Sequence, residues 1–225
     1  MNEEETRNPV VVSLDDVSFF YAPGRPVLSG CNFHLERSER VGLIGPNGSG
    51  KTTLLALIVG LVRPASGRVE VFGKVRSSEA DFHEVRGRAG LLFQDSDDQL
   101  FCPTVAEDVA FGPMNLGKPR REVHEIVART LEALGLAGYE ERITYKLSGG
   151  EKRLVALATV LAMQPEVLLL DEPTSGLDDQ ATERVVEIMA HLPQAMLIVS
   201  HDRSLLKKIT TRSLRLSDGR LEPEG

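Results

Sequence analysis

Short runs of apolar residues mark the first hundred positions of the chain and predict strands. Five such runs lie at residues 10–17, 27–35, 40–44, 67–72 and 89–93. The first two are separated by residues 22–24, whose proline and glycine favour a turn. The run at 40–44 leads into a glycine-rich segment, after which residues 51–60 predict a helix. We therefore expect an N-terminal antiparallel β region, followed by a strand, a turn and a helix.

From about residue 96 to residue 164 the apolar positions recur with the period of an α-helix. In the segment 120–134 they are Val123, Ile126, Val127, Leu131 and Leu134. After Gly150 they are Leu154, Leu157, Ala158 and Leu161. This stretch therefore predicts a helical subdomain.

Strands return in the last quarter of the chain. Residues 167–170 are uniformly apolar, as is typical of a parallel strand buried on both faces, and residues 195–199 repeat the pattern after a predicted helix at 181–192. Residues 213–219 predict a last strand and turn. Strands that alternate with helices imply a doubly wound α/β core with a mostly parallel sheet. We expect one domain over residues 1–225, with the helical subdomain of about 96–164 inserted into its core.

Composition narrows the possible environments and partners. A net charge of −7 over 225 residues argues against a general nucleic-acid binder, which usually carries a basic surface. The longest apolar runs, at 54–62 and 154–163, are about half the roughly 20 residues that a membrane-spanning helix needs. Residues 1–9 are polar and lack the pattern of a signal peptide. The two cysteines, Cys31 and Cys102, show no metal-ligand spacing, so we expect a reduced, cytosolic setting.

Residues 45–52 have the sequence GPNGSGKT, which fits the phosphate-binding pattern G-x-x-x-x-G-K-[ST]. Glycines allow consecutive backbone N–H groups to point inward, and the helix that follows adds partial positive charge. Lys51 is then expected to reach the β- and γ-phosphates of ATP, and the Thr52 hydroxyl to bind Mg²⁺. The alternative is a chance glycine-rich turn, but the match follows a predicted strand and opens a predicted helix, as a phosphate loop requires.

Two acidic residues, Asp171 and Glu172, end the apolar run at 167–170. In a doubly wound sheet the carboxyl ends of the strands face the ligand crevice. We therefore expect Asp171 near Mg²⁺ and Glu172 at the attacking water, where a carboxylate can orient the water and accept its proton. The alternative is an ordinary solvated acid pair.

The segment 147–151, LSGGE, resembles the signature sequence of ABC ATPases. Ser148 and the glycine N–H groups at a helix N-terminus form a second anion site. The resemblance implies a P-loop NTPase fold of the ABC type, and a dimer in which the signature of one subunit closes over the ATP held by the other. Lys152 stands where many members of the family have glutamine.

Four further matches follow in the order of the family and are assigned by that resemblance. Tyr21 corresponds to the aromatic residue that stacks on adenine, and Gln94 to the residue that senses Mg²⁺ and the attacking water. Residues 175–178 resemble the loop that crosses the dimer interface, and His201 resembles the switch histidine at the γ-phosphate. Taken alone, Tyr21 is also compatible with a core or turn aromatic, and His201 with a structural histidine.

The implied sites are as follows. The ATP site of one chain comprises Tyr21, Gly45, Pro46, Asn47, Gly48, Ser49, Gly50, Lys51, Thr52 and Thr53. The partner chain contributes Ser148, Gly149, Gly150, Glu151 and Asp178. The Mg²⁺ ligands are Thr52, Gln94 and Asp171, and the residues of hydrolysis are Glu172, His201 and Gln94.

The stretch from Phe93 to Pro113 resembles the ATPases of energy-coupling factor importers, especially the cobalt and nickel branch, through the blocks 98–101 and 110–113. The resemblance implies a groove that receives a helix of a membrane partner, formed by Asp95, Asp97, Asp98, Gln99, Leu100 and Phe101. Acidic residues there suit arginines on the partner, and Phe101 suits an apolar helix face. The alternative is a solvated acidic loop in which Asp97 or Asp98 caps a helix.

The sequence therefore predicts the ATP-hydrolysing subunit of an energy-coupling factor importer for cobalt or nickel ions, peripheral at the cytoplasmic face of the membrane. Its expected partners are a second copy or a paralogous ATPase, a transmembrane coupling subunit and a substrate-binding membrane subunit. The same motor could serve another cargo, such as the vitamin biotin or an amino acid. A soluble ABC ATPase acting on DNA or ribosomes is disfavoured, because the chain has no room for long coiled coils or a second ATPase domain. A scaffold without turnover is disfavoured by the presence of Glu172 and His201.

Overall fold

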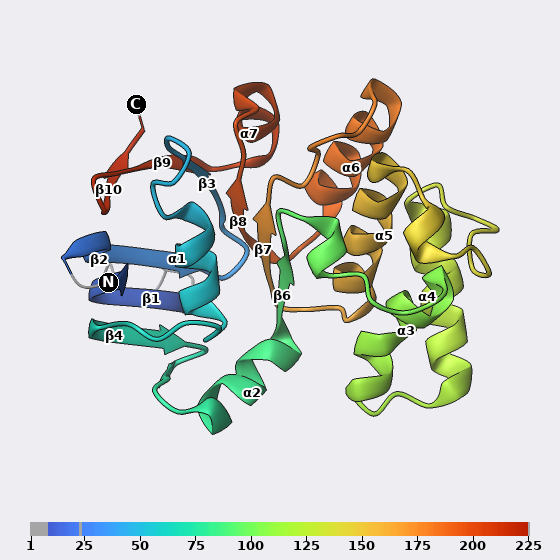
Figure 1. The fold of residues 1–225 in the computed structure, drawn as a ribbon, viewed down its shortest axis with the longest axis horizontal. Coiled ribbons are helices and arrows are strands. Elements are labelled where there is room, and N and C mark those ends of the chain that lie inside the picture. Colours follow the sequence, from blue (N-terminus) through green and yellow to red (C-terminus); the bar gives the residue numbers. More distant parts are fainter. Residues whose placement is uncertain (1–8, 23, 225) are drawn as a thin grey trace, which may run out of the picture. The chain divides into compact units, whose positions relative to one another are not determined.

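A computed structural model describes residues 9–22 and 24–224 of the chain (Figure 1). The described chain divides into two compact units. The first unit is formed by the chain up to Arg86 and from Pro193 onward, and the second unit by Gly87–Leu192. None of the helices formed by the described residues is long and apolar enough to cross a bilayer.

The first unit contains two groups of strands. Its elements are β1 (Val10–Ala22), β2 (Arg25–Glu36), β3 (Arg40–Ile44), α1 (Lys51–Ile58), β4 (Ser66–Val71), β5 (Lys74–Val75), α2 (Glu79–Arg88, which ends just inside the second unit), β8 (Ala195–Val199), α7 (Arg203–Ile209), β9 (Arg212–Ser217) and β10 (Arg220–Pro223). The strands β2, β1, β4 and β5 form an antiparallel sheet in that order. The strand β3 lies parallel to both β8 and β9, and β10 is antiparallel to β9.

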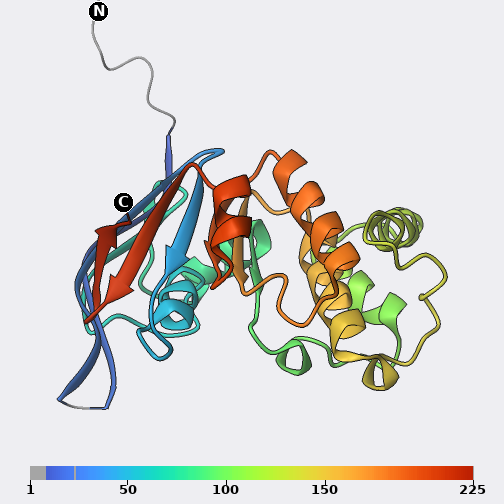
Figure 2. The same cartoon turned by 90° about the horizontal axis from the view of Figure 1, so that it is seen from above.

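The antiparallel sheet agrees with the β region predicted near the N-terminus. From Val12 to Asp15, buried side chains alternate with partly exposed ones along β1, and the register with β2 shifts at a bulge near Asp16, whose φ is +51°. The predicted turn at 22–24 joins the two strands, since Ala22 pairs with Arg25, although Pro23 lies outside the described residues. Helix α1 packs beside this sheet in both views of the molecule (Figure 1, Figure 2).

The second unit is mainly helical. Its elements are β6 (Ala89–Leu92), the 3₁₀ turn η2 (Ser96–Asp98), α3 (Val105–Asn115), α4 (Arg120–Ala133), the 3₁₀ turn η3 (Thr144–Lys146), α5 (Gly149–Ala162), β7 (Val167–Asp171) and α6 (Asp179–His191). The strands β6 and β7 are parallel, and every residue of β7 is buried. Helices α3, α4 and α5 pack on one another (Figure 1). The helices expected between residues 96 and 164 are therefore present, and they lie within this second unit.

Four elements were not predicted from the sequence: α2, α7, β5 and β10. Helix α2 buries only Phe82 and Val85, so its apolar pattern is too sparse to show a helical period. Helix α7 spans 7 residues, which is too short for a periodic pattern to stand out. The strands β5 and β10 are short, and most of their residues are exposed.

Candidate active site

Two segments of the first unit that carry predicted site residues begin at the same edge of its parallel strands. Leu43 of β3 pairs with Val199 of β8, and the Ser200 N–H donates to the Leu43 carbonyl at 3.4 Å. Because parallel strands end at a common edge, the phosphate-loop candidate 45–52 and the exposed His201 both emerge there. The topology therefore brings His201 to the side of the sheet from which the glycine-rich loop starts.

The glycine-rich loop needs glycine at two of its positions. A β-carbon on Gly45 would lie 2.4 Å from the main-chain oxygen of Leu216, which is closer than non-bonded atoms approach. Gly50 has a φ of +104°, and its β-carbon would lie 2.8 Å from Val27 Cγ1. Gly48 also has a positive φ, of +75°, but it faces open space. The loop is thus packed closely against its neighbours at both ends and is open in the middle.

The chemistry inside this loop suits an anion. Lys51 is only 8% exposed, and its Nζ donates to the carbonyls of Gly45 and Pro46 at 2.9 Å each. The Ser49 hydroxyl is buried and has no hydrogen-bond partner among the described residues. Helix α1 begins at Lys51 with no acidic residue in its first turn, so its N-terminal dipole is not neutralised there. A buried cation, an unsatisfied hydroxyl and a helix N-terminus fit the phosphates of a nucleotide, and Thr52 is exposed beside them.

Tyr21 is not a core aromatic. It lies at the end of β1 with 69% of its surface exposed, and its ring meets Phe19 edge to face at 4.8 Å. Its hydroxyl lies 3.1 Å from Thr53 Oγ1 of α1, so Tyr21 stands beside the helix that the phosphate loop opens. The exposed ring is therefore available to a planar ligand group.

The second unit presents its own set of predicted residues at one strand edge. Leu92 of β6 pairs with Leu170 of β7, and the two strands are parallel. Gln94 follows β6, Asp171 is the last residue of β7 and Glu172 follows it, so all three lie at the same edge of the two strands. Asp171 is 2% exposed, whereas Gln94 is exposed to solvent.

The main chain at Glu172 adopts a conformation that is rare for residues with a side chain. Its φ is +52°, in the left-handed region where a β-carbon is strained at a cost of about 1–2 kcal/mol. A buried arginine, Arg153 of α5, donates to the main-chain oxygens of both Asp171 and Glu172. It also donates to those of Phe93 and Gln94. Sequence reasoning missed Arg153, because a single arginine after a glycine motif gives no signal of burial.

The charge of Arg153 is held in a low-dielectric position. Burial lowers the pKa of its guanidinium, and the negative charges of Asp171, Glu172 and Asp95 oppose that shift. All four hydrogen bonds of Arg153 described above go to main-chain oxygens. The side chain therefore acts as a clamp on the backbone that follows β6 and β7.

The signature candidate forms a well-capped helix start. Ser148 is the N-cap of α5, and it forms a capping box with Glu151: each side chain accepts a hydrogen bond from the backbone N–H of the other residue. Tyr139 and Arg142 also donate to the Glu151 carboxylate, at 2.7 and 3.0 Å. Hydrogen bonds to its carboxylate lower the pKa of Glu151. The Ser148 N–H has the largest effect and the Tyr139 hydroxyl the next largest. The Glu151 side chain thus stabilises the helix start. Beside it, Gly149 borders open space, because a β-carbon there would have no neighbour within 4 Å.

Four of the five residues predicted to act on the nucleotide of a partner chain line one hollow of the second unit, and Gly149 is not among them. This cavity of about 430 Å³ is lined by Ser148, Gly150, Glu151 and Asp178. Asp178 is also the N-cap of α6, where its carboxylate accepts from the Ala181 N–H at 2.8 Å. The fold therefore gathers residues that lie about thirty positions apart in the sequence.

The acidic loop, residues 95–101, lies before α3, and the sequence alternative for it was a solvated loop in which Asp97 or Asp98 caps a helix. Asp95, rather than Asp97 or Asp98, caps the turn η2 by accepting from the Asp97 N–H at 2.9 Å. Asp97 instead pairs with Lys152 of α5 at 2.5 Å. Gln99 turns inward, where it accepts from the Phe93 N–H and donates to Ala156 and Thr159 of α5. Asp97 and Gln99 thus fasten the loop to α5.

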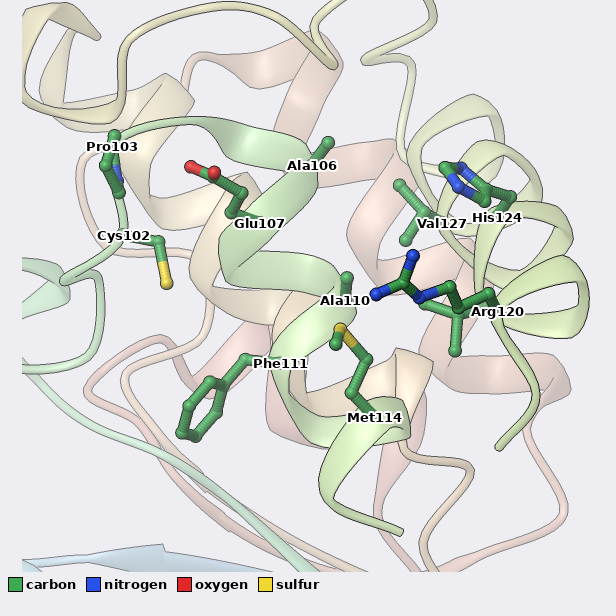
Figure 3. Close-up of a pocket in the computed structure, with 11 residues that line it drawn as sticks. Cys102, Pro103, Ala106, Glu107, Ala110, Phe111, Met114, Arg120, His124 and Val127 are labelled. Carbon is green, nitrogen blue, oxygen red and sulfur yellow. The ribbon is translucent and has the colours of Figure 1, made fainter. Parts of the chain in front are cut away.

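Beside this loop lies a mostly apolar hollow between α3 and α4, which we call the α3–α4 groove (Figure 3). It has a volume of about 510 Å³ and is lined by Cys102, Pro103, Ala106, Glu107, Ala110, Phe111, Met114, Arg120, Val123, His124 and Val127. The exposed Phe101 meets Phe111 edge to face at 4.8 Å, which joins the acidic loop to the groove. Of the six residues predicted for a partner groove, none is among those that line this hollow. Two exposed apolar residues of α3, Phe111 and Met114, line the hollow.

Two side chains near the α3–α4 groove shape its chemistry. Asp108 is buried and accepts from the N–H groups of Phe101 and Cys102 and from the Thr144 hydroxyl, so it fixes the end of the acidic loop. Burial and Asp108 raise the pKa of the Cys102 thiol to about 11, so the thiol is protonated at neutral pH. Among the residues that the structure describes, no group of three or more His, Cys, Asp or Glu side chains is placed to hold a metal ion.

Comparison with known proteins gives a consistent result. Residues 28–175 match the family model described as ABC transporter. The chain is 46% identical over 219 residues to the energy-coupling factor transporter ATP-binding protein EcfA of Methanothermobacter thermautotrophicus, covering 96% of this chain and 70% of that protein.

Solved structures share the whole fold. The structure of CbiO1 from Clostridium perfringens, described as part of the ABC transporter complex CbiONQ, has a TM-score of 0.83 and 32% identity, over 97% of this chain and 89% of that one. The ATP-binding cassette MJ0796, described as dimeric and bound to ADP and phosphate in a post-hydrolysis state, has a TM-score of 0.86 and 26% identity, over 95% and 99%.

Proposed function

Because the chain belongs to the ABC transporter family and is an ATPase of that family, we propose that it drives an energy-coupling factor importer for cobalt or nickel ions. The predicted resemblance to energy-coupling factor ATPases is confirmed by the similarity to EcfA and CbiO1. The predicted P-loop NTPase fold is confirmed by the solved relatives, and the cofactors of the chain are ATP and Mg²⁺. The importer, its cargo and the roles of single residues are our proposal.

ATP binding is assigned to residues of the first unit. Tyr21 offers its exposed ring to the adenine, and the backbone N–H groups of the loop 45–52 surround the phosphates. Lys51, held in the loop by two carbonyls, supplies a positive charge at the β- and γ-phosphates. When bound, Mg²⁺ neutralises charge on the phosphates, and Thr52, Gln94 and Asp171 are the residues that would hold it.

Hydrolysis is assigned to Glu172, with Gln94 and His201. A carboxylate at the end of β7 can orient a water molecule and accept its proton, and the clamped backbone keeps Glu172 in place. Gln94 can hold the same water through its amide group, because it leaves β6 beside β7. His201 can donate a hydrogen bond to the transferred phosphoryl group.

A second ATPase subunit completes each site in this proposal, as the dimeric cassette suggests. The hollow that holds Ser148, Gly150 and Asp178 offers a helix N-terminus to an anion. Since this anion site serves the nucleotide of the partner subunit, ATP binding favours the closed dimer. The partner is a second copy or a paralogous ATPase.

The observation that carries the transport function is the α3–α4 groove. Its apolar lining and the exposed Phe101 beside it form a surface that an amphipathic helix can cover. Asp95 and Asp98 add negative charge at the acidic loop, which suits arginines on such a helix. We assign this surface to a transmembrane coupling subunit, which places the ATPase at the cytoplasmic face of the membrane as a peripheral subunit. A substrate-binding membrane subunit then selects the cargo, which is a vitamin such as biotin in the alternative version of the proposal.

Purification of the full chain from membranes tests this function. We expect a coupling subunit and a metal-binding membrane subunit to co-purify, and the intact complex to take up radioactive cobalt or nickel when ATP is supplied. Phe111→Asp, which places a charge in the α3–α4 groove, should reduce co-purification at least about tenfold, since burying an unpaired carboxylate is costly. Leu61→Asp is the matched control, because Leu61 is an exposed apolar residue of the first unit.

Three results would contradict parts of this assignment. Co-purification of the membrane subunits with Phe111→Asp at the wild-type level would remove the groove from the proposal. Uptake of a vitamin in place of metal ions would replace the cargo and keep the motor. Association with ribosomes or DNA, without membrane subunits, would overturn the transport function.

A further inference from the structure

Arg153 connects three segments of the second unit that carry proposed site residues. It lies on α5, five positions after Ser148, and is 3% exposed. Its Nη1 donates to the Phe93 carbonyl at 2.5 Å and to that of Gln94 at 3.2 Å. Its Nη2 donates to the carbonyls of Asp171 and Glu172, the latter at 2.6 Å. One side chain therefore bonds the first residues after β6 and the residues at the end of β7.

The chemistry of this contact calls for arginine. A buried cation is costly unless its charge is stabilised by hydrogen bonds, and here each terminal nitrogen serves two carbonyls. The guanidinium is planar and rigid, so the two pairs of carbonyls are held at a fixed spacing. A lysine at this position keeps the charge but offers a single ammonium on a flexible stem, which cannot hold both pairs in one plane.

The position of Glu172 makes such a clamp functionally relevant. Its φ of +52° is strained, and strained residues keep their conformation only when their surroundings hold them. The carbonyl of Glu172 is one of the four that Arg153 holds. Lys152, the neighbour of Arg153, pairs with Asp97 at 2.5 Å and ties the same turn of α5 to the acidic loop.

We propose that Arg153 is a positioning residue for ATP hydrolysis, which fixes the main chain of Gln94 and Glu172 relative to the helix that starts at Ser148. The proposal rests on the hydrolytic roles assigned to Glu172 and Gln94 above. Five residues of α-helix span about 7.5 Å, so a shift of the helix start on contact with a second subunit reaches the Glu172 carbonyl through one side chain. Arg153 thereby makes the placement of Glu172 depend on whether the Ser148 end of α5 is engaged.

The test compares variants of the full chain in steady-state ATP hydrolysis. Arg153→Lys is expected to lower kcat about tenfold or more, since small displacements of a reacting group are costly, and to change KM for ATP less than about twofold. Arg153→Met is expected to lower kcat further. Melting temperatures of all variants show whether the fold is retained, and the lysine variant keeps the charge if the methionine variant does not fold.

Arg76 provides a matched control. It is 4% exposed and donates to the carbonyls of Val71 and Asp81 and to the carboxylate of Glu84, none of which is a proposed site residue. Arg76→Lys is expected to lower stability as Arg153→Lys does, but to change kcat less than about twofold. Equal losses of kcat in the two lysine variants would overturn the proposal, because they would show a general effect of disturbing a buried arginine.

A double-mutant cycle shows whether Arg153 acts through Glu172. In a Glu172→Gln background, adding Arg153→Lys should lower the residual rate much less than the roughly tenfold expected in the wild type, since only the effect through Gln94 remains. Independent, multiplying losses would overturn the proposal. If Glu172→Gln alone hydrolyses ATP at the wild-type rate, the role of Glu172 fails and the proposal fails with it. If Glu172→Gln is inactive but Arg153→Lys keeps the wild-type kcat, the proposal alone fails. Neither result depends on cargo or membrane subunits.

Discussion

Glu172 shows how a single backbone angle ties stability to a proposed chemical role. The residue follows β7 with a φ of +52°, where glycine is favoured over residues with a β-carbon. A residue with a β-carbon at this position therefore lowers the stability of the chain relative to glycine. The same conformation directs the main-chain oxygen of Glu172 to Arg153.

We expect Glu172→Gly to be more stable than Glu172→Ala by about 1 kcal/mol, because both lose the carboxylate but only glycine relieves the strain. Urea unfolding of the full chain without nucleotide measures the difference. The same pair of substitutions at Glu125, an exposed residue inside α4, should show the opposite order, since glycine weakens a helix interior by about 1 kcal/mol relative to alanine. An alanine variant at position 172 as stable as the glycine variant would show that the angle carries no strain.

At the scale of the element, the start of α5 combines helix capping with a proposed anion site. Ser148 and Glu151 satisfy backbone N–H groups at the helix start, and Tyr139 and Arg142 hold the Glu151 carboxylate from the side. These contacts lower the pKa of Glu151 from its usual 4.5. A carboxyl group with a lowered pKa in the folded state stabilises the fold above its usual pKa, and this stabilisation is lost as the pH falls through the folded-state value.

Tyr139→Phe removes one donor to the Glu151 carboxylate and should raise the pKa of Glu151 toward 4.5. The variant should therefore lose less stability than the wild type when the pH is lowered below about 4.5. Unfolding free energies measured at several pH values, compared between the two proteins, test this. Tyr145→Phe is the control, because Tyr145 is largely exposed and should leave the pH dependence unchanged. Parallel pH profiles for Tyr139→Phe and the wild type would contradict the assignment.

Elements with strong patterns could be predicted from the sequence, and weak ones could not. The uniformly apolar strand β7 and the periodic helix α4 were predicted to within one residue at each end. Helix α2 was missed because it buries only two residues, and helix α7 because it spans only 7 residues.

Part of the candidate site could be predicted from the sequence, because some of its residues also belong to strong local patterns. Glycine patterns and acids at the ends of strands can be recognised locally, so the sequence alone located Lys51 at the start of a helix and Asp171 and Glu172 at the end of a strand. The contacts of Arg153 join residues far apart in the sequence, and the α3–α4 groove depends on how two helices pack. No local pattern reveals which carbonyls a buried arginine reaches or which helix faces remain uncovered.

At the scale of the whole molecule, the distribution of proposed roles implies that one chain is insufficient. The phosphate loop and His201 are assigned to the nucleotide of their own chain, whereas the hollow with Ser148 and Asp178 is assigned to the nucleotide of a partner subunit. Hydrolysis should then require two chains, and its specific rate should rise with protein concentration.

Glu172→Gln should bind ATP, turn it over slowly and elute as a dimer in size-exclusion chromatography when ATP is present. Adding Ser148→Arg to this variant should keep it monomeric while its affinity for ATP stays within about threefold, because the arginine blocks only the contact with the partner nucleotide. Ala128→Arg, an exposed position on α4, is the control and should leave the ATP-dependent dimer intact. Loss of ATP binding by the monomeric Ser148→Arg variant would show that Ser148 serves the nucleotide of its own chain.

The clamp formed by Arg153 has a consequence for how the protein can change over evolutionary time. Since its bonds end on peptide oxygens, replacing a side chain at position 93, 94 or 171 leaves every one of those acceptors in place. Reactivity can drift at these positions while the scaffold beneath them keeps its shape. Position 153 has no such freedom, because its side chain is the donor in all four bonds. A lineage that loses this arginine must first replace these bonds with others that hold the same backbone, before substitutions at the neighbouring site residues can improve activity.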